Sequence, residues 1–223
     1  MTNTIIAPAG DGAGKTSGNP LLRGMAHLFS FVFHPLFITA YVMAFIIFVH
    51  PYAFAGFDHR TKVMRLLSVI LCNTFLPLFA VFLLWRLQLI KSPMLRNEKE
   101  RIGPYLIAMI FYWWTWLVFK RLPDTPPLAV QFLLGAFLAV CGGWVCNIYF
   151  KISMHGIAMG GMTMFFILFA FHDAYGSGLY IAAALLFTGL VCTSRLLLSA
   201  HTPFEVWSGI FIGVLTQYIG WQF

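Results

Sequence analysis

Charged residues are scarce in this chain, and acidic residues are the scarcest. Of the 223 residues only 9% are charged, with 14 Lys and Arg against 7 Asp and Glu. A soluble domain carries about 25% charged residues, so the composition excludes an ordinary soluble globule. The 60% hydrophobic content also excludes a disordered chain. The chain is therefore expected to lie within a membrane, where the backbone satisfies its own hydrogen bonds by forming helices.

Cysteine is rare as well. The four cysteines, Cys72, Cys141, Cys146 and Cys192, all lie within apolar runs. There a thiol usually serves as a small core residue. They form neither a disulfide framework nor a metal-binding pattern, and the histidines lack the spacing of a zinc site. We therefore expect no metal and no cofactor.

The net charge of +7 does not imply a nucleic-acid partner. The basic residues are scattered at the edges of apolar runs and form no basic groove interleaved with aromatic residues. Membrane lipids and an anionic, phosphorylated lipid substrate are the expected partners. The sequence does not indicate an oligomeric state.

Seven apolar runs have about the length of a membrane span, which needs roughly 20 mostly apolar residues. The runs cover residues 26–49, 64–90, 104–119, 127–150, 153–171, 179–198 and 203–221. They predict an all-α polytopic transmembrane bundle with seven spans, and six is the alternative count. Residues 23–223 form this single domain behind a flexible polar tail, residues 1–22. His34-Pro35 is expected to mark a kink or the end of a span.

Seven spans bring three polar segments to one side of the membrane, although they are far apart in sequence. The segments are residues 96–104, 151–156 and 194–205. The N-terminus is expected on the same side and the C-terminus on the other, because seven is odd. Counting positive charges does not decide which side is cytoplasmic once the candidate ligands are set aside.

Arg195, His201 and Glu205 are the leading candidates for a functional site. Ionisable groups at membrane depth usually mark function, and Arg195 lies in the apolar run LLFTGLVCTSRLLLSA. Two structural alternatives stay open. Arg195 could extend its side chain to the nearby interface. Thr202, Pro203 and Glu205 could form a capping box that starts the last helix.

The order Ser-Arg, five residues, His, three residues, acid resembles the third motif of the type 2 phosphatidic acid phosphatase superfamily. In that motif the acid is Asp. The residues here are Ser194, Arg195, His201 and Glu205. The family's second motif, Pro-Ser-Gly-His, has a partial counterpart in residues 152–155, which keep Ser153 and His155 at the right spacing.

The family's first motif, Lys, six residues, Arg-Pro, is degraded in this chain. The nearest alignment places Arg96 six residues before Gly103-Pro104, with Lys99 and Arg101 as displaced cations. The resemblance covers roughly residues 96–223, the phosphatase-like core. The sequence departs from the family by Glu for Asp, Met for Gly and the missing Arg-Pro.

The resemblance implies a phosphohistidine intermediate on His201, with Glu205 orienting the ring. Elementary chemistry is consistent with this role, because a neutral imidazole can attack phosphorus while a carboxylate fixes its tautomer. His155 would protonate the leaving oxygen and then activate water. Alternatively, Ser153 and His155 merely begin the fifth helix, with Ser153 as its cap. The expected phosphate-binding residues are Arg195, Lys99, Arg101, Ser153, Arg96 and Lys151.

These patterns predict a membrane enzyme that hydrolyses a lipid phosphate or diphosphate without metal. Two alternatives stay open: a phosphotransferase of the same superfamily, and a noncatalytic lipid-phosphate binder or transporter. The substrate could be a polyprenyl diphosphate, phosphatidic acid, phosphatidylglycerol phosphate or lipid A. We expect an integral multi-pass protein of the cell (inner) membrane, and the resemblance favours an outward-facing site.

Overall fold

The computed structural model describes residues 19–91, 101–175 and 177–223, and within them it contains helices and no strand. The helices are α1 (Pro20–Val32), α2 (Pro35–Ala44), η1 (Phe45–Val49), α3 (His59–Ile70), η2 (Leu71–Phe75), α4 (Leu76–Arg86), α5 (Ile102–Arg121), α6 (Pro127–Tyr149), α7 (Met154–His172), α8 (Gly178–Leu197) and α9 (Pro203–Trp221). The segments η1 and η2 are single π-helical turns. The predicted all-α class is confirmed.

Five helices of the described residues are long and apolar enough to cross a membrane. They are the continuous rod of α3, η2 and α4, together with α5, α6, α7 and α8, and the bent pair of α1 with α2 and η1 can make a sixth. Helix α9 is 19 residues long but less apolar, since Glu205 and Gln217 lie within it. A multi-pass membrane bundle is thus supported, and the count of seven stays a prediction.

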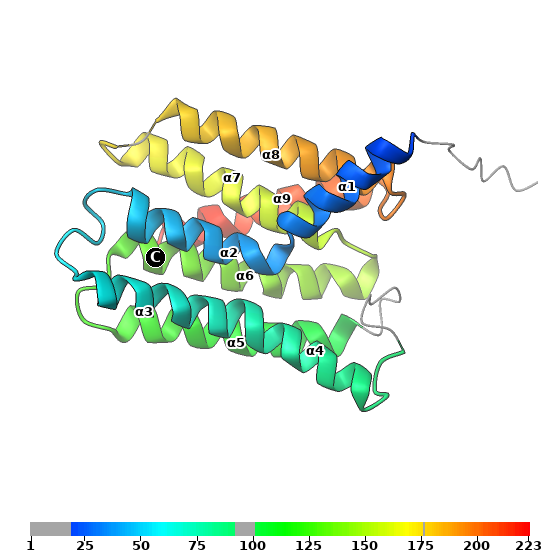
Figure 1. Ribbon diagram of the computed structural model, residues 1–223, viewed down its shortest axis with the longest axis horizontal. Coiled ribbons are helices and arrows are strands. Elements are labelled where there is room, and N and C mark those ends of the chain that lie inside the picture. The colour runs from blue at the N-terminus through cyan, green and yellow to red at the C-terminus, as the bar shows by residue number, and fades with distance from the viewer. Residues whose placement is uncertain (1–18, 92–100, 176) are drawn as a thin grey trace, which may run out of the picture.

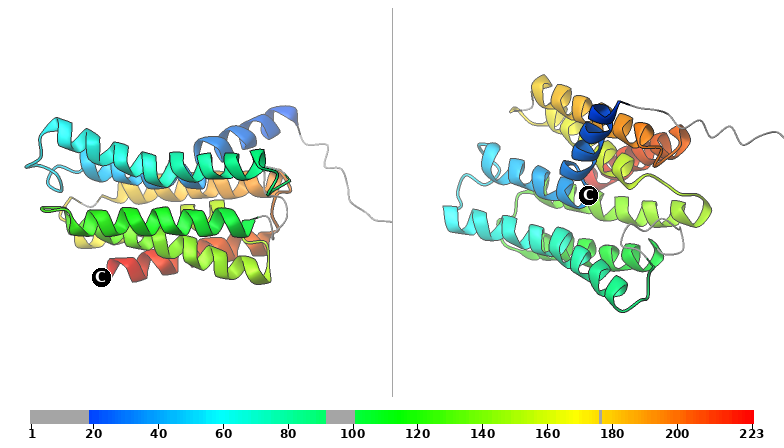
Figure 2. Two further views of the ribbon diagram at one scale, coloured as in Figure 1. Left: turned by 90° about the horizontal axis from the view of Figure 1, so that it is seen from below. Right: turned by 45° about the vertical axis from the view of Figure 1, so that its right-hand side comes forward.

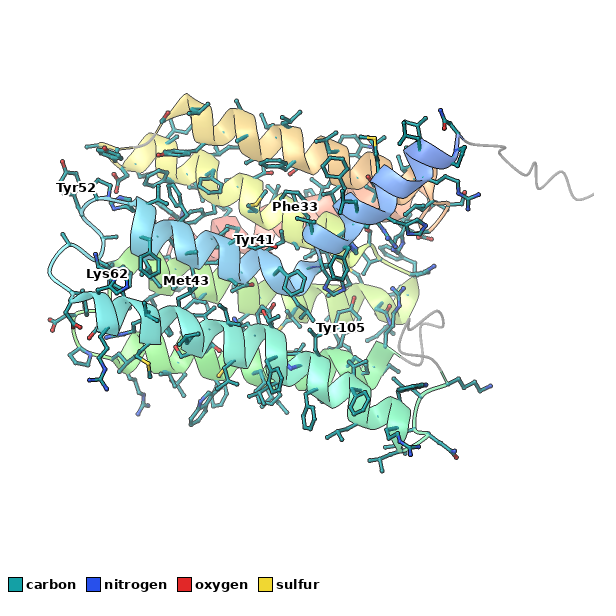
Figure 3. The ribbon with its side chains drawn as sticks, in the orientation of Figure 1. Phe33, Tyr41, Met43, Tyr52, Lys62 and Tyr105 are labelled. Carbon is teal, nitrogen blue, oxygen red and sulfur yellow. The ribbon has the colours of Figure 1, made fainter. Side chains whose placement is uncertain are left out.

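The long helices lie side by side, so their connections gather at two ends (Figures 1 and 2). One end, called the α8–α9 end, holds residues 198–202, the connection 150–153 and the beginning of α1. The C-terminus lies at the opposite end, where Figure 3 also shows Tyr52 and Lys62. The expected gathering of the three polar segments is confirmed for their described parts. Arg96 and Lys99 lie outside the described residues.

The first apolar run is not one helix. Proline at 35 lacks the amide hydrogen that would continue α1, and α1 and α2 are bent by 60° against each other. The side chain of His34 caps α2 by accepting a hydrogen bond from Leu36 N at 3.4 Å. The Tyr41 hydroxyl donates to Val32 O at 2.9 Å and braces the bend. The predicted kink at His34-Pro35 is confirmed.

Helical structure begins at residue 20, three residues before the predicted start of the bundle at residue 23. Helix α1 begins at Pro20, because the Asn19 side chain accepts a hydrogen bond from Leu21 N at 3.0 Å and proline suits the first helical position. Residues 20–22 are therefore helical, and residues 1–18 lie outside the described part.

Helix α9 packs closely along α7, and glycines make this approach possible. A Cβ atom at Gly156 would lie 2.7 Å from Val206 O, and one at Gly209 would lie 2.6 Å from Ser153 O. Neither position has room for a side chain. This contact brings the beginnings of α7 and α9 together at the α8–α9 end, where the candidate residues lie.

Candidate active site at the α8–α9 end

His201 lies in the short connection between α8 and α9. The chain leaves α8 through Ala200, whose N–H donates to Arg195 O at 3.1 Å, and through Ser199, whose φ of 49° is left-handed. Arg195 occupies the last turn of α8, where a cation is favoured by the negative end of the helix dipole. The connection thus places His201 directly after a turn that carries an arginine.

Glu205 is both a helix cap and the partner of His201. Its Oε2 atom lies 2.6 Å from His201 Nδ1 and accepts from Thr202 N at 3.4 Å. In return, Glu205 N donates to Thr202 Oγ1 at 3.3 Å, which completes the capping box. The capping contact and the contact with His201 therefore do not compete, because one carboxylate oxygen makes both.

This pairing leaves the second nitrogen of His201 available. A carboxylate only accepts hydrogen bonds, so Nδ1 of the neutral ring carries the proton and Nε2 carries the lone pair. Nε2 has no hydrogen-bond partner among the described residues. Burial, followed by the positive charges of Arg195 and Lys151, lowers the pKa of His201, against the raising effect of Glu205. The shift favours the neutral imidazole, which has a lone pair on Nε2.

Two of the predicted cations, Arg195 and Lys151, act on this histidine, and a third, Arg101, lies near Arg195. Lys151 Nζ donates to Ala200 O at 3.1 Å, next to His201. Arg101 Nη1 donates to Ile152 O at 3.4 Å, and Arg101 also interacts electrostatically with Arg195. Among the residues that the structure describes at this end, Glu205 supplies the negative charge. Cations held together in this way favour an anionic ligand.

A pocket of about 510 Å³ opens beside these groups. Lys151 lines it from the α6–α7 connection, and His201 and Glu205 line it with neighbouring residues of the α8–α9 connection. It is large enough for a phosphate group, and both the candidate nucleophile and a cation border it.

His155 and Ser153 lie at the start of α7, and both are buried. His155 Nε2 donates to Ser30 O of α1 at 3.0 Å, so Nδ1 carries the lone pair of the neutral ring. The Ser153 side chain accepts from Gly156 N at 3.2 Å and caps α7, as in the structural alternative. Ser153 N also donates to Glu205 O at 3.2 Å, which ties α7 to α9. A phosphate-binding role for Ser153 stays a prediction.

Tyr105 connects α5 to the same region. Its hydroxyl donates to Met154 Sδ, directly before His155, and Figure 3 shows Tyr105 toward the α8–α9 end. Among the described residues, no group of three His, Cys, Asp or Glu side chains could hold a metal ion.

His34 is the residue whose place at the site was not predicted. The sequence indicated only a kink, but the 60° bend sets the His34 ring 5.6 Å from the His155 ring, centroid to centroid, with the planes at 83°. His34 also interacts electrostatically with Arg195. The available signal was an ionisable side chain within an apolar run.

No family model matches this chain, and neither a curated protein nor a solved structure matches it. The resemblance to the type 2 phosphatidic acid phosphatase superfamily is therefore carried by the motif residues alone.

Proposed function

We propose that this protein is a membrane-embedded phosphatase of lipid phosphates or diphosphates, a member of the type 2 phosphatidic acid phosphatase superfamily that acts through a phosphohistidine. The observation that carries the proposal is the arrangement of His201. Its Nδ1 atom is held by Glu205 at 2.6 Å. Its Nε2 atom has no partner among the described residues, and Lys151 and Arg195 lie nearby.

In the first step, His201 Nε2 attacks phosphorus and the bond from phosphorus to the lipid oxygen breaks. Cations stabilise the negative charge on the nonbridging oxygens. Arg195 offers a planar donor fork for them, and Lys151 has further N–H groups beyond the one that it donates to Ala200. Glu205 stabilises the imidazolium that forms.

In the second step, water attacks the phosphohistidine, the P–N bond breaks and inorganic phosphate leaves. We assign His155, with a proton on Nδ1, as the acid for the leaving oxygen; once it has given up that proton, Nδ1 is the base for this water. Its Nε2–H bond to Ser30 O fixes the ring, which leaves Nδ1 for proton transfer.

The proposal includes seven spans, in which α9 crosses with the other helices. The support is its 19-residue length and its packing along α6 and α7. With seven spans, the N-terminus and the candidate site lie on the same side of the membrane. The proposed membrane is the cell (inner) membrane. Reporter fusions at the two termini should report opposite sides, and the same side for both would refute seven spans.

The experiment that tests the function is phosphate release by the purified protein from a panel of lipid phosphates and diphosphates without added metal. We expect turnover by the parent and its loss in His201→Ala. Absence of turnover on every substrate, or substantial activity in His201→Ala, would refute the proposal.

One observation favours a noncatalytic lipid-phosphate binder as the second candidate. His155 is buried and its Nε2 is bonded to a backbone carbonyl, which is also the geometry of a purely structural histidine. Binding of a lipid phosphate without phosphate release would select this candidate.

A further inference from the structure

The contacts of α1 divide the candidate site into two sides. In-line displacement places the nucleophile and the leaving group on opposite sides of phosphorus. His201 marks the nucleophile's side, and His155 marks the leaving group's side. Ser30 O accepts from His155 Nε2, and the His34 ring lies 5.6 Å from that of His155. Ser30 and His34 thus adjoin the position of the leaving group.

Two buried hydrogen-bond donors near His155 have no partner among the described residues, and His34 adds a third donor beside them. The Ser30 hydroxyl is buried, at 8% exposure, and has no partner among the described residues. Arg195 Nε is likewise buried and unpaired. His34 accepts from Leu36 N through Nδ1, so Nε2 of its neutral ring carries a proton. A buried donor without a partner destabilises the protein, so a ligand that accepts from Ser30 Oγ and Arg195 Nε relieves this cost, and His34 Nε2 can donate to the same ligand.

A lipid monophosphate and a lipid diphosphate differ in the leaving group that would lie beside Ser30, His34 and Arg195. A lipid monophosphate releases an alcohol, whose single oxygen is followed by apolar carbon. A lipid diphosphate releases a lipid monophosphate, whose several charged oxygens can accept from Ser30, His34 and Arg195 together. Charge-assisted bonds of this type are about twice as strong as neutral ones.

We infer that the substrate is a lipid diphosphate, and that Ser30, His34 and Arg195 hold the phosphate that stays on the lipid. This inference rests on the proposed function. His201 Nε2 bonds to the terminal phosphorus, and the bond from that phosphorus to the bridging oxygen breaks. The electron pair stays on the bridging oxygen, which takes a proton from His155 Nδ1 and leaves as lipid monophosphate. Water then attacks the phosphohistidine, His155 Nδ1 takes the water's proton, the P–N bond breaks with its electron pair returning to His201 Nε2, and inorganic phosphate is released.

The test compares two substrates with one tail, farnesyl diphosphate and farnesyl monophosphate, in detergent micelles. We expect kcat/KM of the parent to be at least about 10-fold higher for the diphosphate. Ser30→Ala and His34→Asn should each lower the ratio of the two kcat/KM values at least about 5-fold. Asparagine is a favoured helix cap, so His34→Asn keeps the start of α2.

Matched controls come from the opposite half of the molecule. Ser68 donates only within its own helix, to Arg65 O, and His59 is exposed at the start of α3. Ser68→Ala and His59→Asn should leave the ratio within about twofold. Equal or better use of the monophosphate by the parent would overturn the inference. So would an equal loss on both substrates in Ser30→Ala and His34→Asn.

A binding measurement separates failure of the inference from failure of the proposed function. If the parent hydrolyses neither substrate, the phosphatase proposal fails. The nonhydrolysable farnesyl methylenediphosphonate should still raise the melting temperature more than farnesyl phosphonate does, and Ser30→Ala and His34→Asn should remove that difference. If the two compounds raise the melting temperature of the parent equally, the proposed phosphate site of Ser30, His34 and Arg195 is overturned.

Discussion

The molecule has a histidine–carboxylate pair at each end, and the two pairs differ in whether the second ring nitrogen of the histidine has a partner. At the α8–α9 end, His201 Nδ1 lies 2.6 Å from Glu205 Oε2. At the opposite end, His50 Nε2 lies 3.1 Å from Asp173 Oδ2. The second nitrogen makes the difference. His50 Nδ1 accepts from Tyr52 N at 3.2 Å and Ala53 N at 2.8 Å, so both of its ring nitrogens are occupied.

The cations at the two ends differ in the same way. At the opposite end, Arg65 donates to Thr125 Oγ1 at 2.8 Å and lies against the ring of Phe119, while Lys120 lies over the ring of Trp116. At the α8–α9 end, Arg195 Nε is buried without a partner among the described residues. A buried histidine–carboxylate pair therefore indicates a ligand-binding site only when the second ring nitrogen and hydrogen-bond donors of the neighbouring cations have no protein partners and can bind a ligand.

The largest effect is expected from Arg195→Met. Loss of the guanidinium removes several charge-assisted bonds to the phosphoryl oxygens. The value of kcat/KM should fall at least about 1000-fold, roughly 4 kcal/mol of barrier. Lys120→Met is the control at the opposite end and should keep activity within about twofold. More than a tenth of parental activity in Arg195→Met would contradict the assignment.

The next largest effect is expected from Glu205→Gln, which is compared with Asp173→Asn at the opposite end. Gln replaces Glu in a capping box, so Glu205→Gln should fold with a melting temperature near the parent's. It removes the charge that stabilises the His201 imidazolium, and turnover should fall at least about 100-fold, roughly 2.7 kcal/mol. Asp173→Asn makes the same chemical change at the opposite end and should keep turnover within about twofold. Near-parental turnover in Glu205→Gln would reduce Glu205 to a helix cap.

Glycine substitutions along α9 should disturb the two ends separately. A Cβ at Gly209 would lie 2.6 Å from Ser153 O, and one at Gly220 would lie 2.5 Å from Gly135 N. Both Ala variants should lower the unfolding free energy by about 1 to 3 kcal/mol, as measured by thermal unfolding. Only Gly209→Ala should also lower turnover, by about 10-fold, since it pushes α7 from α9 beside Glu205. Gly189→Ala, with nothing within 4 Å of its Cβ, is the control.

The smallest effect is a shift in pH dependence. Burial and the nearby cations lower the pKa of His201, so the acid limb of kcat/KM should lie below the ordinary histidine value of about 6.5. Glu205 raises this pKa, so Glu205→Gln should move the limb to lower pH. Lys151 lowers it, so Lys151→Met should move the limb to higher pH. The pH dependence of kcat/KM is measured on one substrate for the parent and both variants. Shifts of the acid limb opposite to these directions would exclude His201 as the group that titrates.

The sequence predicted the elements that depend on local pattern. Apolar length predicted the long helices, and the spacing from Thr202 to Glu205 predicted the capping box. The four-residue spacing from His201 to Glu205 also placed the two side chains together, because they flank one helix start. The gathering of Arg101, Lys151 and Arg195 followed from the direction of successive helices.

The sequence did not predict contacts that depend on three-dimensional angles. The approach of His34 to His155 needs both the 60° bend and the packing of α1 on α8, and no periodicity encodes either. The His50 pair with Asp173 spans 123 positions and arises because two connections meet at one end. The early start of α1 depends on a single side chain, the cap of Asn19.

The measurement that tests the central claim most directly is trapping of the covalent intermediate. Purified protein is mixed with a lipid diphosphate radiolabelled in its terminal phosphate, quenched within one turnover, and mapped by peptide. The account predicts an acid-labile, base-stable label on His201, absent in His201→Ala and absent from His50. Turnover without a label on His201, or with the label on another residue, would contradict it.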